Sequence, residues 1–483
     1  MSLSQNLKEK GIDAPILIMQ SSGGMMRAEV AVEKPINVIE SGPAAGVVGA
    51  AYLGKRLNID NLLTLDMGGT TAKVSMIEGG QFTRSDEYQV GGGISIGSRL
   101  ITGGGYVLRV PSIDIAEVGA GGGSYLWLDS AKGFHVGPIS AGAVPGPACY
   151  DSGGNRPTIT DANVVIGYLN PYYLLAGELK LKPERARRAI ENEIAKPLNM
   201  DPLEAAYGGF IIANSSMIRA IRAVSSQKGR DIRNFTLFAF GGAGPIHATT
   251  IAQELGIPKV LVPPNSGLFS SVGLLFADIE YHHMETFHYA LNESIVDKIN
   301  GVLAKMADMA LSMAKRGQHT EVEVTIDKYL SMRYIGQATE LTILSPWTKI
   351  DPEKISLLKE AFHQEHQKTY LNSAVEEPIE IVKLRVVARV ISDHKKVAGD
   401  MKLGKRFESS YKVKEVRKAY FGKQYGLLDT EILRQNDVSS IPKEGPLIVE
   451  LYDTTIVVPP KCNISRGDQD IFVINIAAAT KKE

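Results

Sequence analysis

One stretch of the sequence, residues 62–77, constrains the fold more than any other. An apolar run ends at Asp66, two glycines and two threonines follow, and a second apolar run resumes with period-two alternation. This pattern predicts strand, tight turn and strand, which is a β-hairpin with a polar tip. The tip consists of Gly68, Gly69, Thr70 and Thr71.

The polar tip suits a phosphate group. Glycines let backbone N–H groups come close to an anion, and threonine hydroxyls add further donors. Asp66, at the base of the tip, is of the residue type that holds a hydrated Mg²⁺ or orients a water molecule. The spacing leaves one alternative open, an ordinary hairpin in which Gly68 and Gly69 serve only the turn.

Composition and charge indicate a soluble globular protein that acts on small molecules. The 483 residues are 44% hydrophobic and 22% charged, which is ordinary for a chain of two to four domains. Lysine plus arginine equals aspartate plus glutamate at 53 each, so no basic field favours nucleic acid or an anionic membrane. The two cysteines lie far apart, as is typical of a reducing cytosol, and no apolar run is long enough to span a bilayer. We therefore expect a cytoplasmic protein with neither nucleic acid nor membrane as a partner.

A second glycine-rich loop follows the apolar run at residues 235–240. The loop contains Gly241, Gly242 and Gly244, and a helix is expected to start near Ile246. A glycine loop between a strand and a helix places backbone N–H groups and the positive end of the helix against an anion or a nucleotide. This loop is therefore a second candidate for a nucleotide contact.

His247 bears on both the class and the chemistry of this loop. It stands where a dinucleotide-binding fingerprint would have its third glycine, so that class of site is excluded. A lone histidine at a helix start is commonly a structural residue with satisfied hydrogen bonds. A role in binding the nucleotide, or in a hinge, is the alternative, and both stay open from the sequence.

Six side chains between residues 110 and 165 are further candidates for chemistry. None of them has the spacing of a helical metal site, so a second divalent metal is a hypothesis with Asp114 and Asp161 as its candidate ligands. The six candidates are Asp114, Glu117, Asp129, His135, Cys149 and Asp161.

The chain is expected to divide into three domains. Residues 1–288 form the first and contain a glycine-rich insertion at about 85–165, for which flexible surface loops are the alternative. Residues 289–392 combine an amphipathic helix at 291–317, whose methionines are expected in the core, with later strands. Residues 393–483 are rich in strands and turns.

The hairpin carries a family resemblance. Asp66-Met67-Gly68-Gly69-Thr70-Thr71-Ala72-Lys73 resembles the phosphate hairpin of the actin, sugar kinase and Hsp70 superfamily. Its form is similar to that of the hydantoinase A and 5-oxoprolinase family, which includes N-methylhydantoinase A and the acetone and acetophenone carboxylase subunits. The segments that agree with this family in order are 40–46, 118–124, 140–150, 157–163 and 240–248. The resemblance implies an α/β fold with an actin-like, ribonuclease H-like ATPase core and a β-rich C-terminal domain.

The resemblance also implies ATP and Mg²⁺ as cofactors and gives individual residues their roles. Asp66 would orient Mg²⁺ or its water, Lys73 would neutralise charge near the phosphates, and with Thr70 they form the expected catalytic set. The nucleotide-binding set that the resemblance implies is Gly68, Gly69, Thr70, Thr71, Gly241, Gly242, Gly244 and His247.

By this resemblance, the expected function is the ATP-dependent opening of a cyclic amide of the hydantoin or 5-oxoproline type, through phosphorylation of its carbonyl oxygen. The first alternative is the ATP-binding subunit of an acetone- or acetophenone-type carboxylase. The second is a non-catalytic, nucleotide-binding scaffold subunit. Ala116 stands where the family often has histidine, and this departure favours the carboxylase branch.

The resemblance implies partners as well. The family's subunit normally begins with a segment that carries another Asp-x-Gly-Gly-Thr hairpin, whereas this sequence has a single hairpin of that kind. We therefore expect the first lobe to be supplied in cis or in trans. A hydantoinase B-like subunit and a small-molecule substrate are the other expected partners, and a homo-oligomer is a further expectation.

Overall fold

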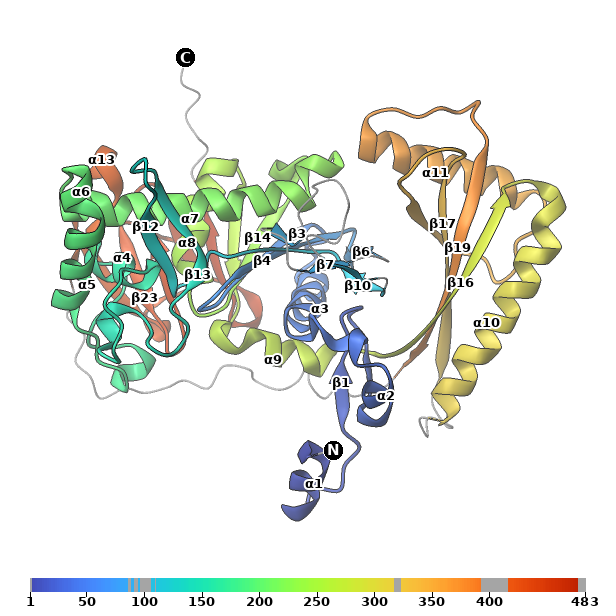
Figure 1. Cartoon of the computed structure of the whole chain (residues 1–483), viewed down its shortest axis with the longest axis horizontal. Helices are drawn as coiled ribbons and strands as arrows, with labels where there is room; N and C mark the ends of the chain where they lie inside the picture. Colours follow the sequence, from blue (N-terminus) through green and yellow to red (C-terminus); the bar gives the residue numbers. More distant parts are fainter. Residues whose placement is uncertain are drawn as a thin grey trace.

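The computed structural model describes residues 2–85, 88–90, 94–95, 106–108, 110–316, 323–391 and 416–476. The glycine clusters of the predicted insertion, at 91–93 and 103–105, lie outside these ranges. Within them the chain has a mixed α/β fold that is built on two large sheets, each covered by helices (Figure 1).

The predicted hairpin lies at the centre of the larger sheet. Strands β3 (Leu62–Met67) and β4 (Ala72–Glu78) pair antiparallel, so the hairpin prediction is confirmed. Strand β14 (Thr236–Phe240) lies parallel to β3, and β15 (Lys259–Val262) lies parallel to β14. The full order is β22-β25-β26-β15-β14-β3-β4-β11-β8, with β5 (Gln81–Phe82) beside β4. The remaining members are β8 (Ile94–Ser95), β11 (Ile115–Val118), β22 (Lys443–Glu444), β25 (Asn463–Arg466) and β26 (Phe472–Asn475).

Side chains on the two faces of β3 pack into two separate hydrophobic cores. Leu63 and Leu65 pack with α7 (Pro202–Val224) and α8 (Gly244–Leu255), which cover one face. Leu62 packs on the other face with α3 (Ser41–Arg56) and α9 (Phe269–Gly273). Figure 1 shows α7 and α8 on one side of β3 and β4, with α3 and α9 on the other. The segment in which the sequence predicted a strand is therefore a strand, and it is buried on both faces.

The second sheet has six strands in the order β1-β2-β16-β19-β17-β18. Helices α10 (Val296–Arg316) and α11 (Lys354–Tyr370) cover it. Met306 of α10 is fully buried, as expected for a core methionine, whereas Met309 is 37% exposed, so the expectation for the helix's methionines holds only in part. The strands are β1 (Leu17–Met19), β2 (Met25–Arg27), β16 (Ile279–Ala290), β17 (Val324–Tyr334), β18 (Leu341–Ser345) and β19 (Ile379–Val390).

The C-terminal residues also supply a four-stranded sheet, β20-β21-β23-β24, whose strand β24 lies against α8. Its strands are β20 (Val416–Tyr420), β21 (Leu427–Arg434), β23 (Leu447–Glu450) and β24 (Thr455–Val458). The remaining helices and strands are α1 (Ser2–Glu9), α2 (Ala28–Glu33), β6 (Arg84–Ser85), β7 (Tyr88–Val90), β9 (Tyr106–Leu108), β10 (Ser112–Ile113), β12 (Ser124–Leu128), β13 (Phe134–Ser140), α4 (Ile159–Val165), α5 (Pro183–Ile190), α6 (Lys196–Leu198) and α13 (Gly422–Tyr425).

The expected domain limits cut across these sheets. Strands β1 and β2 join the six-stranded sheet, while β25 and β26, from the other end of the chain, join the sheet of the hairpin. The three-domain division stays a prediction. The expected insertion at 85–165 needs a correction, because β11 pairs with β4 and α4 packs on α7, so both belong to the core.

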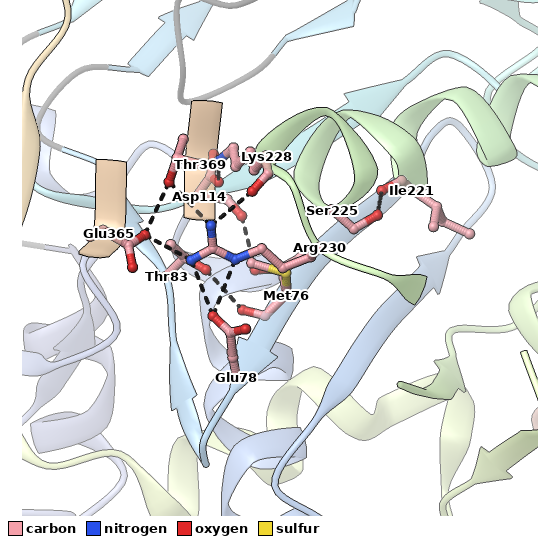
Figure 2. A network of polar contacts seen from close by, with 11 residues as sticks. Met76, Glu78, Thr83, Asp114, Ile221, Ser225, Lys228, Arg230, Glu365 and Thr369 are labelled. Atoms are coloured by element: carbon pink, nitrogen blue, oxygen red, sulfur yellow. Dashed lines mark hydrogen bonds and ion pairs between the residues drawn. The ribbon is translucent and has the colours of Figure 1, made fainter. Parts of the chain in front are cut away.

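A polar network, shown in Figure 2, joins the six-stranded sheet's helix α11 to the far end of the hairpin. The guanidinium of Arg230, 8% exposed, lies 2.7 Å from Glu365 of α11 and 3.2 Å from Glu78 of β4. Thr369 accepts a hydrogen bond from Arg230, and Lys368 pairs with Glu78 at 2.8 Å. Burial would raise the pKa of Glu78, but Lys368 and Arg230 together hold it below its ordinary value.

Replacing Arg230 by methionine is expected to lower the free energy of unfolding by about 1–2 kcal/mol. The change leaves two carboxylates without their shared cation, and the loss is moderate because Glu78 and Glu365 keep about a third of their side-chain surface in solvent. Urea denaturation measures the effect. Arg233→Met is the matched control, because that arginine is 73% exposed beside Asp231 and its loss should leave stability nearly unchanged. Equal losses in both variants would contradict the role given to the network.

Candidate functional site

The hairpin tip presents an open set of donors. Gly68, Gly69 and Thr70 are exposed, and nothing lies within 4 Å of the position that a Cβ would take on either glycine. In the described part of the chain, the backbone N–H groups of Gly69, Thr70 and Thr71 donate to no protein acceptor. Three consecutive free N–H groups in an exposed turn can receive the oxygens of an anion.

A glycine-rich segment between β11 and β12, residues 119–123, contacts this tip and holds it in place. Gly122 donates its N–H to the carbonyl of Gly68 at 3.0 Å, and Gly123 donates to the carbonyl of Gly69 at 2.6 Å. A Cβ on Gly121 would lie only 2.4 Å from the backbone of Thr70, so this position requires glycine. In the sequence these glycines stood out through their density and through the family resemblance of residues 118–124, but their contact with the tip was not predicted.

The second predicted loop lies directly beside the first. Phe240 is opposite Asp66 in the parallel pairing of β14 with β3, and Ala243 donates its N–H to the carbonyl of Met67 at 3.0 Å. Gly241 has a φ of +81°, and a Cβ there would lie 2.6 Å from Oδ1 of Asp66. The tertiary structure thus brings together the two glycine loops that the sequence separates by some 170 residues.

Gly244 and Gly242 have different positions in this loop. Gly244 is buried at the start of α8, where a Cβ would lie 3.2 Å from the carbonyl oxygen of Leu65. Gly242 is exposed at the loop surface. Of the two, Gly242 is the one in a position to contact a ligand, while Gly244 lets the helix start close to the strand.

The turn between β23 and β24 forms hydrogen bonds with the second glycine loop, at residues 241–244. The sequence analysis did not predict this contact. The hydroxyl of Thr454 donates to the carbonyl of Gly242 at 3.0 Å, and the carboxylate of Asp453 accepts from the N–H of Gly267 at 2.8 Å. Burial raises the pKa of Asp453, while the N–H groups that it accepts from oppose this shift. No motif marked these residues, since their role arises only when the C-terminal strands fold back onto the sheet.

Asp66 lies at the base of the tip with little compensation for its charge. Burial raises the pKa of its carboxyl above the ordinary value, while the positive charge of Lys73 and a hydrogen bond from Ser270 act in the opposite direction. A half-buried carboxylate beside free N–H donors has the chemistry that Mg²⁺ prefers, which is oxygen ligation completed by water and phosphate. Asp66 therefore fits the ion that the sequence predicted.

Lys73 lies beside the tip and is held there. Its ammonium donates to the hydroxyl of Thr71 at 3.0 Å and forms an ion pair with Glu117 of β11 at 3.1 Å. Both the lysine and the glutamate side chains are 22% exposed. A cation therefore lies beside the tip. The role that the resemblance implies for Lys73, which is to neutralise charge near the phosphates, stays a prediction.

The two speculative metal ligands, Asp114 and Asp161, do not form a metal site. Asp114 is buried and forms an ion pair with Lys228. Asp161 is fully buried and accepts hydrogen bonds from the N–H groups of Cys149 at 2.7 Å and Thr158 at 2.9 Å, where it caps helix α4. Across the described ranges, no group of three or more histidine, cysteine, aspartate or glutamate side chains is arranged to hold a metal ion. The second divalent metal is therefore a wrong prediction for these two residues.

His247 is a structural histidine in the interior. Its Nδ1 donates to Oδ1 of Asn214 at 2.6 Å, its Nε2 accepts from Asn163 at 3.4 Å, and its ring stacks on Phe210 at 4.6 Å. It is 0% exposed, so the predicted direct contact with a nucleotide does not fit its placement. It instead joins helices α4, α7 and α8 behind the glycine loop.

The burial of His247 should make the stability of the protein depend on pH. Burial lowers the pKa of His247 to about 3, so between the ordinary pKa of about 6.5 and that value only the unfolded chain takes up the proton. Stability is therefore expected to fall as the pH falls, and His247 alone accounts for about 2 kcal/mol between pH 7 and pH 5. Urea denaturation of the wild type and of His247→Gln at pH 7 and pH 5 measures the difference, because the variant lacks this proton uptake. Identical pH slopes would contradict the assignment.

The inference that was drawn from Ala116 in favour of the carboxylase branch also needs a correction. It is fully buried in the core on the α7 and α8 side of the sheet, whereas Asp66 faces the α3 and α9 side. A side chain at position 116 therefore points away from the candidate site, and its identity does not report on a substrate contact there.

Comparisons with known proteins add an independent line of evidence. The sequence profile described as hydantoinase/oxoprolinase matches residues 1–283, and the profile of the hydantoinase/oxoprolinase C-terminal domain matches residues 287–474. None of the helices in the described ranges combines the length and the apolar character that crossing a bilayer requires.

Two relatives show how much of a longer protein the chain represents. A protein of uncharacterized function from Methanocaldococcus jannaschii is 40% identical over 457 residues, which are 94% of this chain and 64% of that protein. The caprolactamase subunit alpha of Pseudomonas jessenii is 32% identical over 468 residues, which are 95% of this chain and 64% of that subunit. The chain therefore spans less than two thirds of the length of each relative.

Two solved structures resemble the whole chain. The crystal structure of the ATP-dependent caprolactamase from Pseudomonas jessenii matches with a TM-score of 0.82 and 29% identity, over 98% of this chain and 67% of that one. The nucleotide-free structure of acetone carboxylase matches with a TM-score of 0.73 and 26% identity, over 98% of this chain and 66% of that one.

Proposed function

The chain belongs to the hydantoinase/oxoprolinase family, and on that premise we propose that it is the nucleotide-binding part of an enzyme that opens a cyclic amide at the expense of ATP. The observation that carries the proposal is the meeting of the two glycine loops beside Asp66. The free N–H groups of residues 69–71 would hold the phosphates, Asp66 would hold Mg²⁺, and residues 241–242 would face the nucleoside. The β3, β4, β11, β14 and β15 unit would then be one lobe of an actin-like ATPase.

The proposed chemistry is a phosphoryl transfer followed by hydrolysis. The amide oxygen attacks the γ-phosphorus of ATP and ADP leaves, which makes the amide carbon electrophilic. Water then adds to that carbon and the ring C–N bond breaks, which leaves an acyl phosphate. A second water hydrolyses the acyl phosphate to a carboxylate and inorganic phosphate. Mg²⁺ would neutralise charge on the transferring phosphoryl group, while the N–H groups of the tip and the ammonium of Lys73 stabilise its oxygens.

Carboxylation of a ketone is the second candidate, supported by the likeness to acetone carboxylase. Both reactions begin with phosphoryl transfer to an oxygen, so the same hairpin would serve either one. Phosphate release that requires a ketone together with bicarbonate would favour carboxylation. Release with a cyclic amide alone would favour ring opening.

We also propose that the chain acts with further polypeptide. The caprolactamase relative is a subunit, and the chain spans 64% of its length. The expected additions are a first lobe that carries a second phosphate hairpin, in cis or in trans, and a hydantoinase B-like subunit. With a single phosphate hairpin, the isolated chain should bind Mg·ATP weakly.

Isothermal titration calorimetry tests the ATP proposal. Mg·ATP is titrated into the chain alone and into the chain combined with the family's N-terminal segment, with Asp66→Asn as the control. We expect binding to strengthen when the segment is added and to weaken at least about tenfold in the variant, because a ligand of Mg²⁺ is lost. No binding in either case would remove the ATP proposal and favour a scaffold subunit, as would binding without substrate-dependent phosphate release in the complete complex.

A further inference from the structure

Three charged side chains form a row across the sheet beside the tip. In the antiparallel pairing of β3 with β4, Asp66 lies opposite Lys73, and in the pairing of β4 with β11, Lys73 lies opposite Glu117. Directly opposite residues of antiparallel strands point to the same face. All three side chains therefore project on the face that α3 and α9 cover, with the cation between two carboxylates.

Lys73 contacts only one of these two carboxylates. Its ammonium lies 3.1 Å from Glu117 and 3.0 Å from the hydroxyl of Thr71. Among the described residues, no ion pair within 4 Å joins Lys73 to Asp66, although the two stand opposite each other. The glutamate and the threonine together turn the ammonium toward β11 and the tip, and away from Asp66.

Because Lys73 pairs with Glu117, no cation among the described residues contacts Asp66. Burial raises the pKa of Asp66 and so disfavours its charged form, and Lys73 and Ser270 are the groups that oppose this shift. A carboxylate in this state gains most from a divalent cation. An ammonium placed on Asp66 would instead occupy the same oxygens and compete with that cation.

We propose that Glu117 is a positioning residue that holds Lys73 on the phosphate side of the hairpin and so keeps the carboxylate of Asp66 available to Mg²⁺. The inference rests on the proposed binding of Mg·ATP. It gives Glu117 a role that acts through Lys73, its ion-pair partner on the neighbouring strand.

A double-variant cycle tests whether Glu117 acts through Lys73. The probe is Mn²⁺ with ATP, and its affinity is measured by electron paramagnetic resonance on the chain combined with the N-terminal segment. Glu117→Gln is expected to weaken Mn²⁺ binding roughly tenfold, because the freed lysine moves onto Asp66. Glu117→Gln in a Lys73→Met background should cause no further loss, and Glu117→Asp should retain part of the wild-type affinity.

The remaining outcomes are decisive as well. Wild-type affinity in Glu117→Gln would overturn the inference, and so would an equal loss in the Lys73→Met background, which would make Glu117 a direct metal contact. If the wild type itself binds no Mn·ATP, the proposed function fails, and a crystal structure of Glu117→Gln then tests the positioning alone. The inference expects the Lys73 ammonium within 4 Å of Asp66 in that structure, and an unmoved lysine would overturn it.

Discussion

Replacing Asp161 by alanine is expected to lower the free energy of unfolding by at least about 3 kcal/mol. The carboxylate is fully buried and is the shared acceptor for the loop that precedes α4. Its donors are the N–H groups of Ala148 at 3.1 Å, Cys149 at 2.7 Å and Thr158 at 2.9 Å and the hydroxyl of Thr158 at 2.8 Å. Alanine leaves these donors buried without an acceptor, and each unsatisfied donor costs about 1–3 kcal/mol.

The loss should extend to the tip of the hairpin formed by β3 and β4. Thr160, the neighbour of Asp161, donates both its N–H and its hydroxyl to the carbonyl of Gly122, which in turn bonds to Gly68 at the tip. Thermal unfolding and amide hydrogen exchange of Gly122 and Cys149 measure the two effects.

Asp151→Ala is the matched control for Asp161→Ala. Asp151 lies in the same loop but pairs with Arg185 in solvent, so its loss should cost less than about 1 kcal/mol. Unchanged stability in Asp161→Ala would show that the buried carboxylate does not organise the loop.

Replacing Gly121 by alanine is expected to displace the hairpin tip and to weaken Mg·ATP binding about 100-fold. The new Cβ would lie 2.4 Å and 2.5 Å from backbone atoms of Thr70 and 2.5 Å from the nitrogen of Thr71. These are main-chain atoms, so relief requires a shift of the tip itself. A shifted tip loses two or more N–H contacts to phosphate, and hydrogen bonds to charged groups are worth about 1.5–3 kcal/mol each.

Calorimetry with Mg·ATP and hydrogen exchange at Gly122 and Gly123 test this prediction. The overpacking itself should cost the fold only about 1–3 kcal/mol, so the variant remains folded while it loses affinity. Gly301→Ala in α10 is the control, since nothing lies within 4 Å of the added methyl there. Wild-type affinity in Gly121→Ala would contradict the proposal that the tip holds the phosphates.

The candidate site depends on both ends of the chain. The hairpin and the glycine loop come from the segment that matches the first family profile, while Thr454 and Asp453 come from the segment that matches the second. Thr454 bonds to the carbonyls of Gly241 and Gly242, so the C-terminal strands help to set the shape of the loop. Residues 1–283 without the C-terminal strands would therefore lack part of the support of their own glycine loop.

The sequence by itself determined the features that are local in the chain. The hairpin at 62–77 and the strand, loop and helix at 235–255 follow from apolar periodicity and from glycines at fixed positions. Asp66 and Lys73 were found because they belong to that hairpin. The family was found in the same way, since its motifs are short and continuous.

Only the tertiary structure decided the roles that depend on what a side chain meets across the fold. Asp114 and Asp161 have the composition of metal ligands, yet one meets Lys228 and the other meets backbone N–H groups, which satisfies their charge without a metal. His247 follows the second glycine loop but lies in the interior, where burial lowers its pKa and favours the neutral form. Glu117 carried no motif, and its pairing with Lys73 arises because β11 lies beside β4. Strand order and burial set these partners, and neither is encoded in the spacing of residues along the chain.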